Sequence, residues 1–333
     1  MIELDYILNQ FSKVKVNKMK PVIRNILRSA VYQLKYMDSV PDSAVCNEAV
    51  KLAVKKGFGT LRGFVNGVLR NVARGLDQVE YPAEVYSMPE WILKLWKKTY
   101  DLDVIESMLQ AFQEETPVTI RCNLAKTTPE NLKESLQKEG VTVTPHPYLS
   151  YAFWIQDYDH LSELESFQKG AFYVQDISSM LVGELADPKK GDRVIDVCAA
   201  PGGKALHVAE KLRGTGSVEA RDLSLYKVGL ITENIERSGL TNIHAVQKDA
   251  TVCDADVKDA ADLVIADLPC SGLGVLAKKT DLKYKATEQG TKELAGLQRE
   301  ILKNAASYVR PGGTLIYSTC TINPAENIEN VHW

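Results

Sequence analysis

Apolar residues at three-to-four-residue spacing mark the first part of the chain as helical. The stretch that begins at Pro21 carries Val22, Ile23, Ile26, Leu27, Ala30, Val31 and Leu34 at this spacing. Pro21 suits the first turn of a helix, where its missing N–H leaves no hydrogen bond unmade. A second helix is expected over about 42–57, and a third over about 64–75. The pattern therefore predicts a small all-α domain at residues 1–76.

The pattern then becomes mixed. Helical spacing is present near 89–112 and 129–139, whereas "PVTIRCNL" and "YAFWIQ" are rich in β-branched and aromatic residues and predict strands. We expect a linker and a small α+β domain at 77–165. Four aromatic side chains of this region could stack on bases, although a place in the core is favoured: Tyr148, Tyr151, Phe153 and Trp154.

From about residue 170 strand and helix patterns alternate regularly. The strand runs are "RVIDVC", "GSVEARD", "NIHAVQ", "DLVIAD" and "GTLIYST", and most are separated by helical segments. Such alternation predicts an α/β domain at 166–333 with a mostly parallel sheet that is covered on both faces. Sheets of this kind bind ligands at the carboxyl ends of their strands.

Composition and charge narrow the class of protein. The chain of 333 residues is 45% apolar and 25% charged, which is typical of soluble globular proteins. No apolar run approaches the roughly 20 residues that cross a bilayer, and the acidic, mixed start is not a secretory signal. We therefore expect a cytoplasmic protein without a membrane partner. Residues 1–75 contain thirteen Lys/Arg and five Asp/Glu, an excess that suggests a polyanion partner such as nucleic acid. On charge alone, a solvated helical surface is an equally good explanation.

A glycine pair follows the first strand of the α/β region directly, in the segment "AAPGGK". Gly202 and Gly203 let a ligand approach the backbone and the N–H groups of the next helix. The G-x-G-x-x-G spacing of dinucleotide folds is missing, and Pro201 removes one N–H donor. These features disfavour the alternative of an NAD-dependent oxidoreductase.

Aspartates recur at the ends of successive strands. Asp222 ends the second strand about 20 residues after Gly202, where a carboxylate can accept both ribose hydroxyl protons. Asp249 follows the third strand, Asp267 ends the fourth, and Asp196 lies within the first. Several carboxylates around one crevice repel a phosphate-rich ligand but suit a ribose, an adenine amine and a cationic sulfonium. S-adenosylmethionine (SAM) fits this description, although each aspartate alone could be a turn residue or helix cap.

Two of the six cysteines occupy similar positions. Cys270 follows the fourth strand in "ADLPCSGLG", and Cys320 follows the fifth in "YSTCTINPAEN". No C-x-x-C pair or histidine cluster is present, so we expect no metal site. Most free cysteines are simply small buried hydrophobes. In the usual strand order of methyltransferase sheets, however, the first, fourth and fifth strands are neighbours, which would place both thiols at one pocket.

Three long segments carry a family resemblance. "DVCAAPGGKALHVAEKL", "ADLPCSGLGVL" and "YSTCTINPAENIE" resemble the signature segments of RNA cytosine-5 methyltransferases, in the order of that family. "GAFYVQDISSMLV" is similar to the segment that leads into their catalytic domain, and "CNEAVKLAVKKGFGTLRGFVNGVLRNV" resembles a NusB-like RNA-binding domain. The combination resembles the Sun/RsmB type, whose members methylate a cytosine of small-subunit ribosomal RNA. It implies a Rossmann-like SAM-dependent methyltransferase domain at 166–333, preceded by a NusB-like domain.

The resemblance also implies roles for single residues. Cys320 would attack carbon 6 of the cytosine and Cys270 would assist breakdown of the covalent adduct, while Asp267 would contact the cytosine edge or the methionyl part of SAM. The SAM site implied by the motifs consists of Cys198, Ala199, Ala200, Pro201, Gly202, Gly203, Lys204, Asp222, Asp249 and Asp267. Arg121 and Asn123 match a recurrent segment of the middle domain, and a structural role in a strand is equally expected for them.

The expected substrate is small-subunit ribosomal RNA, and the expected state is a monomer. A transfer RNA substrate stays open, as does a noncatalytic RNA-binding or assembly role on a methyltransferase fold. Retention of both thiols and of the strand-end aspartates argues against the noncatalytic role. Members of the family usually continue beyond "NPAENIE" into a final strand pair, so the C-terminal end is expected to be short.

Overall fold

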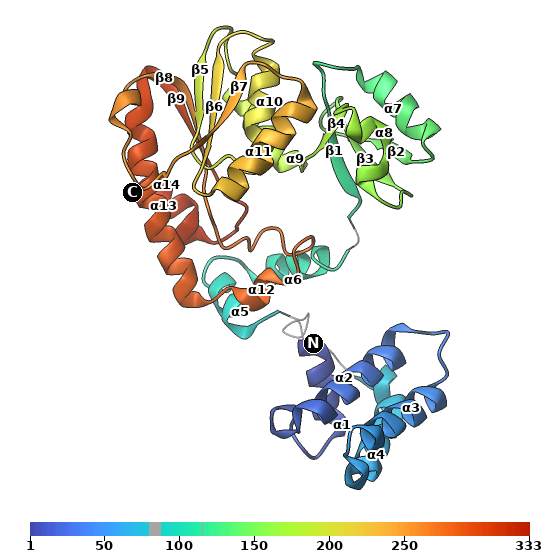
Figure 1. Ribbon diagram of the computed structural model, residues 1–333. Helices are drawn as coiled ribbons and strands as arrows, with labels where there is room; N and C mark the ends of the chain where they lie inside the picture. Colours follow the sequence, from blue (N-terminus) through green and yellow to red (C-terminus); the bar gives the residue numbers. More distant parts are fainter. Residues whose placement is uncertain (80–87, 115) are drawn as a thin grey trace. The chain divides into compact units, whose positions relative to one another are not determined.

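The computed structural model describes residues 1–79, 88–114 and 116–333 (Figure 1). The chain divides into two compact units, Met1–Glu114 and Glu115–Trp333. Most of the expected linker, residues 80–87, lies outside the described residues.

The first unit contains the three helices that the periodicity predicts, α2 (Pro21–Tyr36), α3 (Asp42–Lys55) and α4 (Arg62–Gly75). A helix that the periodicity does not predict, α1 (Ile2–Phe11), precedes them, and α5 (Glu90–Trp96) and α6 (Leu102–Ala111) follow. The first four helices share a core that includes Ile7, Leu8, Ile23, Leu27, Val45, Val65 and Leu69. Helix α1 is fastened to α2 by Asp5, which pairs with Arg28 at 2.5 Å. Burial of its apolar face against α2 and α4 therefore stabilises a helix whose sequence is acidic and mixed.

The second unit starts with an antiparallel sheet in the order β2-β3-β1-β4. Its strands are β1 (Val118–Cys122), β2 (Thr142–Pro145), β3 (Ala152–Gln156) and β4 (Phe172–Val174), and its helices are α7 (Pro129–Lys138) and α8 (Glu165–Gln168). The strands expected around 118–122 and 151–156 are confirmed. Because β4 pairs with β1, the sheet extends past the expected domain boundary at residue 165.

The second sheet is parallel throughout and has the order β7-β6-β5-β8-β9. Its strands are β5 (Arg193–Asp196), β6 (Ser217–Asp222), β7 (Ile243–Gln247), β8 (Ala261–Asp267) and β9 (Val309–Ser318). The accompanying helices are α9 (Ile177–Ala186), α10 (Gly203–Lys211), α11 (Leu225–Ser238), α12 (Leu282–Lys285), α13 (Glu288–Tyr308) and α14 (Ile328–His332). The α/β fold is confirmed, and so is the expectation that the first, fourth and fifth strands (β5, β8 and β9) are neighbours.

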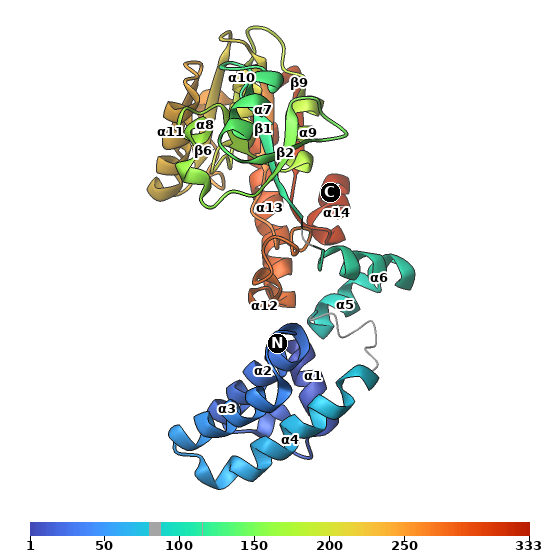
Figure 2. The same ribbon diagram turned by 90° about the vertical axis from the view of Figure 1, so that its right-hand side faces the viewer.

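Helices cover both faces of the parallel sheet, as Figures 1 and 2 show. Val194 packs in a core with Leu206 of α10, whereas its neighbour Ile195 packs in a separate core with Ile301 of α13. Successive side chains of a strand point to opposite faces, so one buried strand supplies both cores. No helix of the described residues is long and apolar enough to span a membrane.

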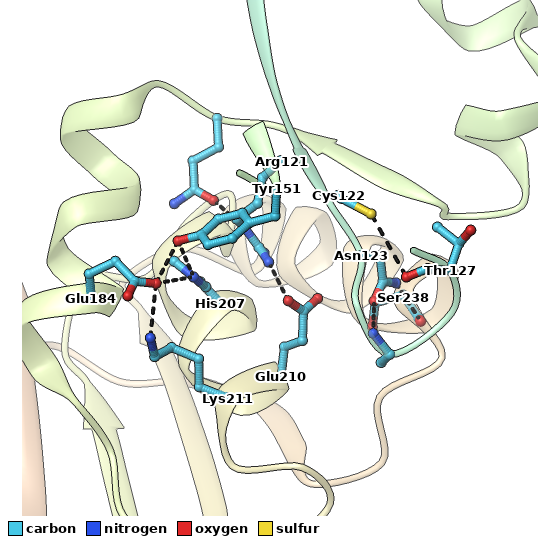
Figure 3. A network of polar contacts seen from close by, with 12 residues as sticks. Arg121, Cys122, Asn123, Thr127, Tyr151, Glu184, His207, Glu210, Lys211 and Ser238 are labelled. Atoms are coloured by element: carbon cyan, nitrogen blue, oxygen red, sulfur yellow. Dashed lines mark hydrogen bonds and ion pairs between the residues drawn. The ribbon is translucent and has the colours of Figure 1, made fainter. Parts of the chain in front are cut away.

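Arg121 of β1 connects the antiparallel sheet to the helices of the parallel one (Figure 3). Its guanidinium is fully buried, donates from Nε to Gln175 at 2.7 Å and pairs with Glu210 of α10 at 2.9 Å. It also lies over the ring of Tyr173, 4.3 Å from the centroid. A buried charge is tolerated only when it is paired. Arg121 therefore has a structural role in the strand, as the sequence allowed.

Further contacts complete this attachment. The hydroxyl of Tyr151 donates to Glu184, which also accepts from Lys211 at 2.9 Å, and His207 lies beside both (Figure 3). Burial lowers the pKa of His207 to about 2, so its ring is neutral. Asn123 donates from its amide to two backbone carbonyls, at 2.8 and 3.1 Å. The two sheets of the second unit are therefore joined by buried polar contacts.

Candidate active site

The glycine turn joins the end of β5 to the start of α10. Gly202 has a φ of +107° at the N-terminal end of the helix, a conformation that residues with a Cβ rarely adopt. Asp222, at the end of β6, accepts a hydrogen bond from the backbone N–H of Ala200 at 3.2 Å and pairs with Lys227 at 3.1 Å. The buried carboxylate of Asp222 thus fixes the turn against the neighbouring strand.

The carboxylates at this edge provide a test of whether a SAM site fits. Asp196 is fully buried, and its Oδ2 atom has no hydrogen-bond partner among the described residues. Burial raises the pKa of Asp196 to about 7, and the negative charges of Asp267 and Asp222 act in the same direction. Carboxylates that repel one another favour a cationic ligand with hydroxyl donors, so the residues present fit SAM.

Two of the remaining residues predicted to bind the cofactor, Cys198 and Asp249, differ in their burial and in their distance from the centre of the sheet. Burial and the charge of Asp196 raise the pKa of Cys198 to about 12, so this thiol is neutral. Asp249 lies exposed beyond the end of β7, an edge strand, and accepts a hydrogen bond from the hydroxyl of Thr251 at 2.7 Å. That hydrogen bond holds the pKa of Asp249 below its ordinary value. The strand order thus separates Asp249 from Asp267, while it brings Asp196 and Asp267 onto neighbouring strands.

Lys204 and Asp267 contact each other directly. The ammonium of Lys204, in the first turn of α10, lies 2.6 Å from a carboxylate oxygen of Asp267 and 3.2 Å from the hydroxyl of Ser179. Asp267 also accepts from the hydroxyl of Ser318 at 2.7 Å, since the two residues are register partners on β8 and β9. Sequence patterns do not indicate this pair or the two serines, because the contacts depend on how α10 meets the sheet.

The two thiols of the predicted catalytic pair are adjacent. The Sγ atoms of Cys270 and Cys320 lie 3.2 Å apart, and the backbone N–H of Cys320 donates to the sulfur of Cys270 at 3.3 Å. Cys320 is exposed, whereas Cys270 is partly buried. Both residues follow strands that are direct neighbours, β8 and β9. The structure therefore brings together two thiols that are far apart in sequence.

The hydrogen bond between these thiols makes them chemically unequal. Donation from Cys270 lowers the pKa of Cys320 to about 7, although partial desolvation of the sulfur and the negative charge of Asp267 act in the opposite direction. The same hydrogen bond, together with burial, raises the pKa of Cys270 above its ordinary value. The thiolate is the nucleophilic form of cysteine, so at neutral pH Cys320 is the better nucleophile.

Other candidate groups lie outside this pair. Cys46 and Cys122 are buried, and Cys253 is exposed. Among the described residues no group of three or more His, Cys, Asp or Glu could hold a metal ion. Sequence reasoning assigned no role to Glu326, a fully buried carboxylate within "NPAENIE". The only sequence signal for Glu326 is a charged residue within the second thiol segment, six positions after Cys320.

Family models match most of the chain. A model described as 16S rRNA methyltransferase RsmB/F matches residues 184–333, the NusB family model matches residues 1–74, and an RsmF/B-like ferredoxin-like domain matches residues 88–158. Similar curated proteins include the probable ribosomal RNA small subunit methyltransferase B of Bacillus subtilis, which is 38% identical over 99% of this chain and 76% of its own length. The protein of the same name from Synechocystis is 35% identical over 97% of this chain and 75% of its own length.

Solved structures agree with these matches. The crystal structure of PH0851 has a TM-score of 0.79 and 26% identity, over 99% of this chain and 76% of that one. The structure of NSun6 from Pyrococcus horikoshii with SFG, an analogue of SAM, has a TM-score of 0.68 and 26% identity, over 73% of this chain and 86% of that one. SAM is accordingly the cofactor of the present chain. With relatives of this similarity along nearly its whole length, the chain belongs to the RsmB/F family of methyltransferases.

Proposed function

We propose that this protein methylates carbon 5 of a cytosine in small-subunit ribosomal RNA, through a covalent bond between Cys320 and carbon 6 of the base. The observation that carries the proposal is the 3.2 Å separation of the Cys270 and Cys320 sulfurs at the ends of neighbouring strands. The ribosomal RNA methyltransferase names of the relatives support the choice of substrate. We further propose that the protein acts in the cytoplasm as a monomer.

Cys320 would act first. Its thiolate adds to carbon 6 of the cytosine, and the electron pair of the ring double bond moves toward carbon 5, which becomes nucleophilic. The bound SAM supplies a methyl group on a positively charged sulfur. The pKa of Cys320, about 7, supports this role because much of the thiol is ionised at neutral pH.

Cys270 would act second. While Cys320 is a thiolate, the hydrogen bond to it helps to hold the pKa of Cys270 above its ordinary value, so Cys270 keeps its proton. Once Cys320 is bonded to carbon 6, that negative charge is gone and Cys270 loses its proton more readily. Its thiolate can then remove the proton from carbon 5. The released electron pair re-forms the ring double bond and expels Cys320 as a thiolate.

The cofactor-binding roles are proposals of the same kind. The turn from Cys198 through Lys204 would offer backbone N–H groups, and Asp222 would accept the ribose hydroxyls. Asp267 faces Lys204 and would lie at the boundary between cofactor and base. Asp249, exposed beyond β7, would contact the adenine amine.

RNA docking is assigned to the helical domain proposed at residues 1–76. The excess of eight positive charges in residues 1–75 supports a polyanion partner. The remaining proposed domains are 77–165, for RNA binding, and 166–333, for catalysis. Because phosphate neutralisation releases counterions, RNA affinity should weaken steeply with salt. RNA binding that is insensitive to salt would contradict this assignment.

Three measurements test the function. The first, equilibrium binding of SAM and of NADH, decides between the methyltransferase and oxidoreductase chemistries. The second is a methyl-transfer assay on undermethylated ribosomal RNA and, in parallel, on transfer RNA, and the third maps 5-methylcytosine in both RNAs. Formation of 5-methylcytosine in ribosomal RNA alone is the expected result. Transfer to transfer RNA alone would overturn the substrate, and SAM and RNA binding without any transfer would favour a noncatalytic role.

A further inference from the structure

Glu326 is a fully buried carboxylate that accepts hydrogen bonds from Ser271, the residue that follows Cys270. It ends the short turn Pro324–Glu326 and has an exposed fraction of 0%. Its side chain accepts four hydrogen bonds, from the backbone N–H of Ser271 at 2.8 Å, the hydroxyl of Ser271 at 2.6 Å, the amide of Asn323 at 2.9 Å and the amide of Gln298 at 3.1 Å. Burying a carboxylate is costly, and four donors offset that cost.

Three of the four donors come from the loops that carry the two thiols: two groups of Ser271, after Cys270, and the amide of Asn323, after Cys320. Ser271 directly follows Cys270, and Thr321 directly follows Cys320. The hydroxyls of Ser271 and Thr321 lie 2.8 Å apart. Since the single hydroxyl proton of Ser271 goes to Glu326, Thr321 must be the donor to Ser271. One carboxylate therefore organises the residue that follows each thiol.

A third element fixes the same carboxylate. Gln298 of α13, which is fully buried, donates from one amide nitrogen to Glu326 and to the carbonyl of Pro269 at 2.8 Å. Pro269 directly precedes Cys270, so the residues on both sides of this thiol are held. The other end of the Gln298 amide accepts from Asn330 at 2.8 Å. The loop of Cys270 is thus fastened both to the helix and to the segment after β9.

We propose that Glu326 is a positioning residue, which holds the Cys270 and Cys320 loops together so that their thiols stay within hydrogen-bond distance. Only an acceptor without a proton suits this place, because all four neighbouring groups donate to it. Each carboxylate oxygen accepts two of the four hydrogen bonds, so a glutamine would turn its amide N–H₂ toward two of these donors. The catalytic consequence of this inference rests on the proposed function, whereas the positioning itself does not.

The pKa of Cys320 is a measure of how closely the Cys270 and Cys320 loops approach each other. The groups that face this thiol are Cys270, Asp267, Lys279 and Lys204, and the hydrogen bond from Cys270 has the largest effect on its pKa. Hydrogen bonds weaken steeply with distance, so separation of the loops removes this effect first. The pKa of Cys320 should then return toward the ordinary value of 9.0.

The test compares Glu326→Gln with Glu329→Gln, a control at an exposed position of α14. Ser271→Ala is the second test variant, because it removes one hydroxyl and leaves the carboxylate in place. The alkylation rate of Cys320 by iodoacetamide is followed against pH by mass spectrometry of the peptide that contains it. Thermal unfolding and SAM binding identify the variants that are folded.

In folded Glu326→Gln and Ser271→Ala proteins, the midpoint of the alkylation profile should rise by about one pH unit or more. Methyl transfer should lose about tenfold or more in kcat, with little change in KM for SAM. A wild-type midpoint in either folded variant would overturn the proposal, as would an equal shift in Glu329→Gln. If Glu326→Gln does not fold, Ser271→Ala decides. Because alkylation needs neither RNA nor SAM, its outcome is independent of the proposed function.

Discussion

Lys204 of α10 forms an ion pair with Asp267 of β8, with 2.6 Å between the ammonium and a carboxylate oxygen. The pair joins the glycine turn to the strand that leads to Cys270. Both side chains are largely removed from water, with exposed fractions of 16% and 31%. It therefore places one positive charge among the carboxylates at this edge of the sheet.

Replacement of Lys204 by Met should make Cys320 less acidic. Lys204 lowers the pKa values of both Cys320 and Asp196, so its loss raises both. The alkylation profile of Cys320 is expected to move to higher pH, together with a loss of methyl transfer. Lys189→Met removes a charge from an exposed pair and serves as the control. An unchanged profile in folded Lys204→Met protein would count against an electrostatic role.

The two thiol variants should fail in different ways. Cys320→Ala is expected to abolish methyl transfer, because the nucleophile is lost. Cys270→Ala should leave a covalent protein–RNA adduct that survives denaturing electrophoresis, because the base for its breakdown is lost. An adduct formed by the Cys320 variant instead would reverse the assignment of the two roles.

The rate of methyl transfer should depend on the ionisation of Cys320. Its pKa is lowered to about 7, so the thiol is protonated below this pH and becomes a thiolate above it. Under single-turnover conditions the rate is expected to fall about tenfold for each pH unit below the midpoint and to level off above it. SAM binding measured at the same pH values controls for loss of cofactor. A rate that is independent of pH across this range would contradict a thiolate nucleophile.

Loss of Arg121 should destabilise the second unit strongly. Arg121→Met leaves the buried carboxylate of Glu210 without its ion-pair partner, at a cost of about 3–5 kcal/mol in the free energy of unfolding. Adding Glu210→Leu should recover part of this loss, because the uncompensated charge is then removed. Lys138→Met, which breaks an exposed pair with Glu134, should have little effect in the same urea titration.

Gly183 marks the close approach of α9 to α10. A Cβ atom at this position would lie 2.4 Å from Nδ1 of His207, whose ring is buried. Gly183→Ala should therefore lower the free energy of unfolding by about 1–3 kcal/mol. Gly229 of α11 has open space around it, so Gly229→Ala is expected to raise stability by about 0.5–1 kcal/mol. Equal effects of both substitutions in thermal unfolding would show that helix propensity decides, rather than packing.

The sequence predicts the parallel sheet well, because its strands are short runs with buried positions and most of them are separated by helical segments. It does not predict β2 and β4, which have four and three residues and owe their pairing to β3 and β1. Helix α1 is not predicted for a related reason. Its acidic residues form ion pairs with Arg28 and Lys35 of α2, and these partners are far away in the sequence. Short or mixed segments are determined by tertiary contacts, which a local pattern does not contain.

In the candidate site, too, some features can be predicted from local motifs and others depend on tertiary packing. The motifs locate Cys270, Cys320 and Asp267 at strand ends, and the strand order then brings them to one edge. The motifs do not predict that Lys204 pairs with Asp267, or that Glu326 accepts from Ser271 of one thiol loop and from Asn323 of the other. These contacts require the relative positions of a helix, two strands and a turn, which are set by the packing of the whole unit.

The thiol pair spans 50 positions of the chain, and its members meet only when β8 and β9 lie side by side. A chain that is still emerging or collapsing thus carries two ordinary, weakly reactive sulfhydryls. Acidity of the nucleophile arises with the finished sheet, so the protein acquires a reactive sulfur only when it also has the surroundings that direct it.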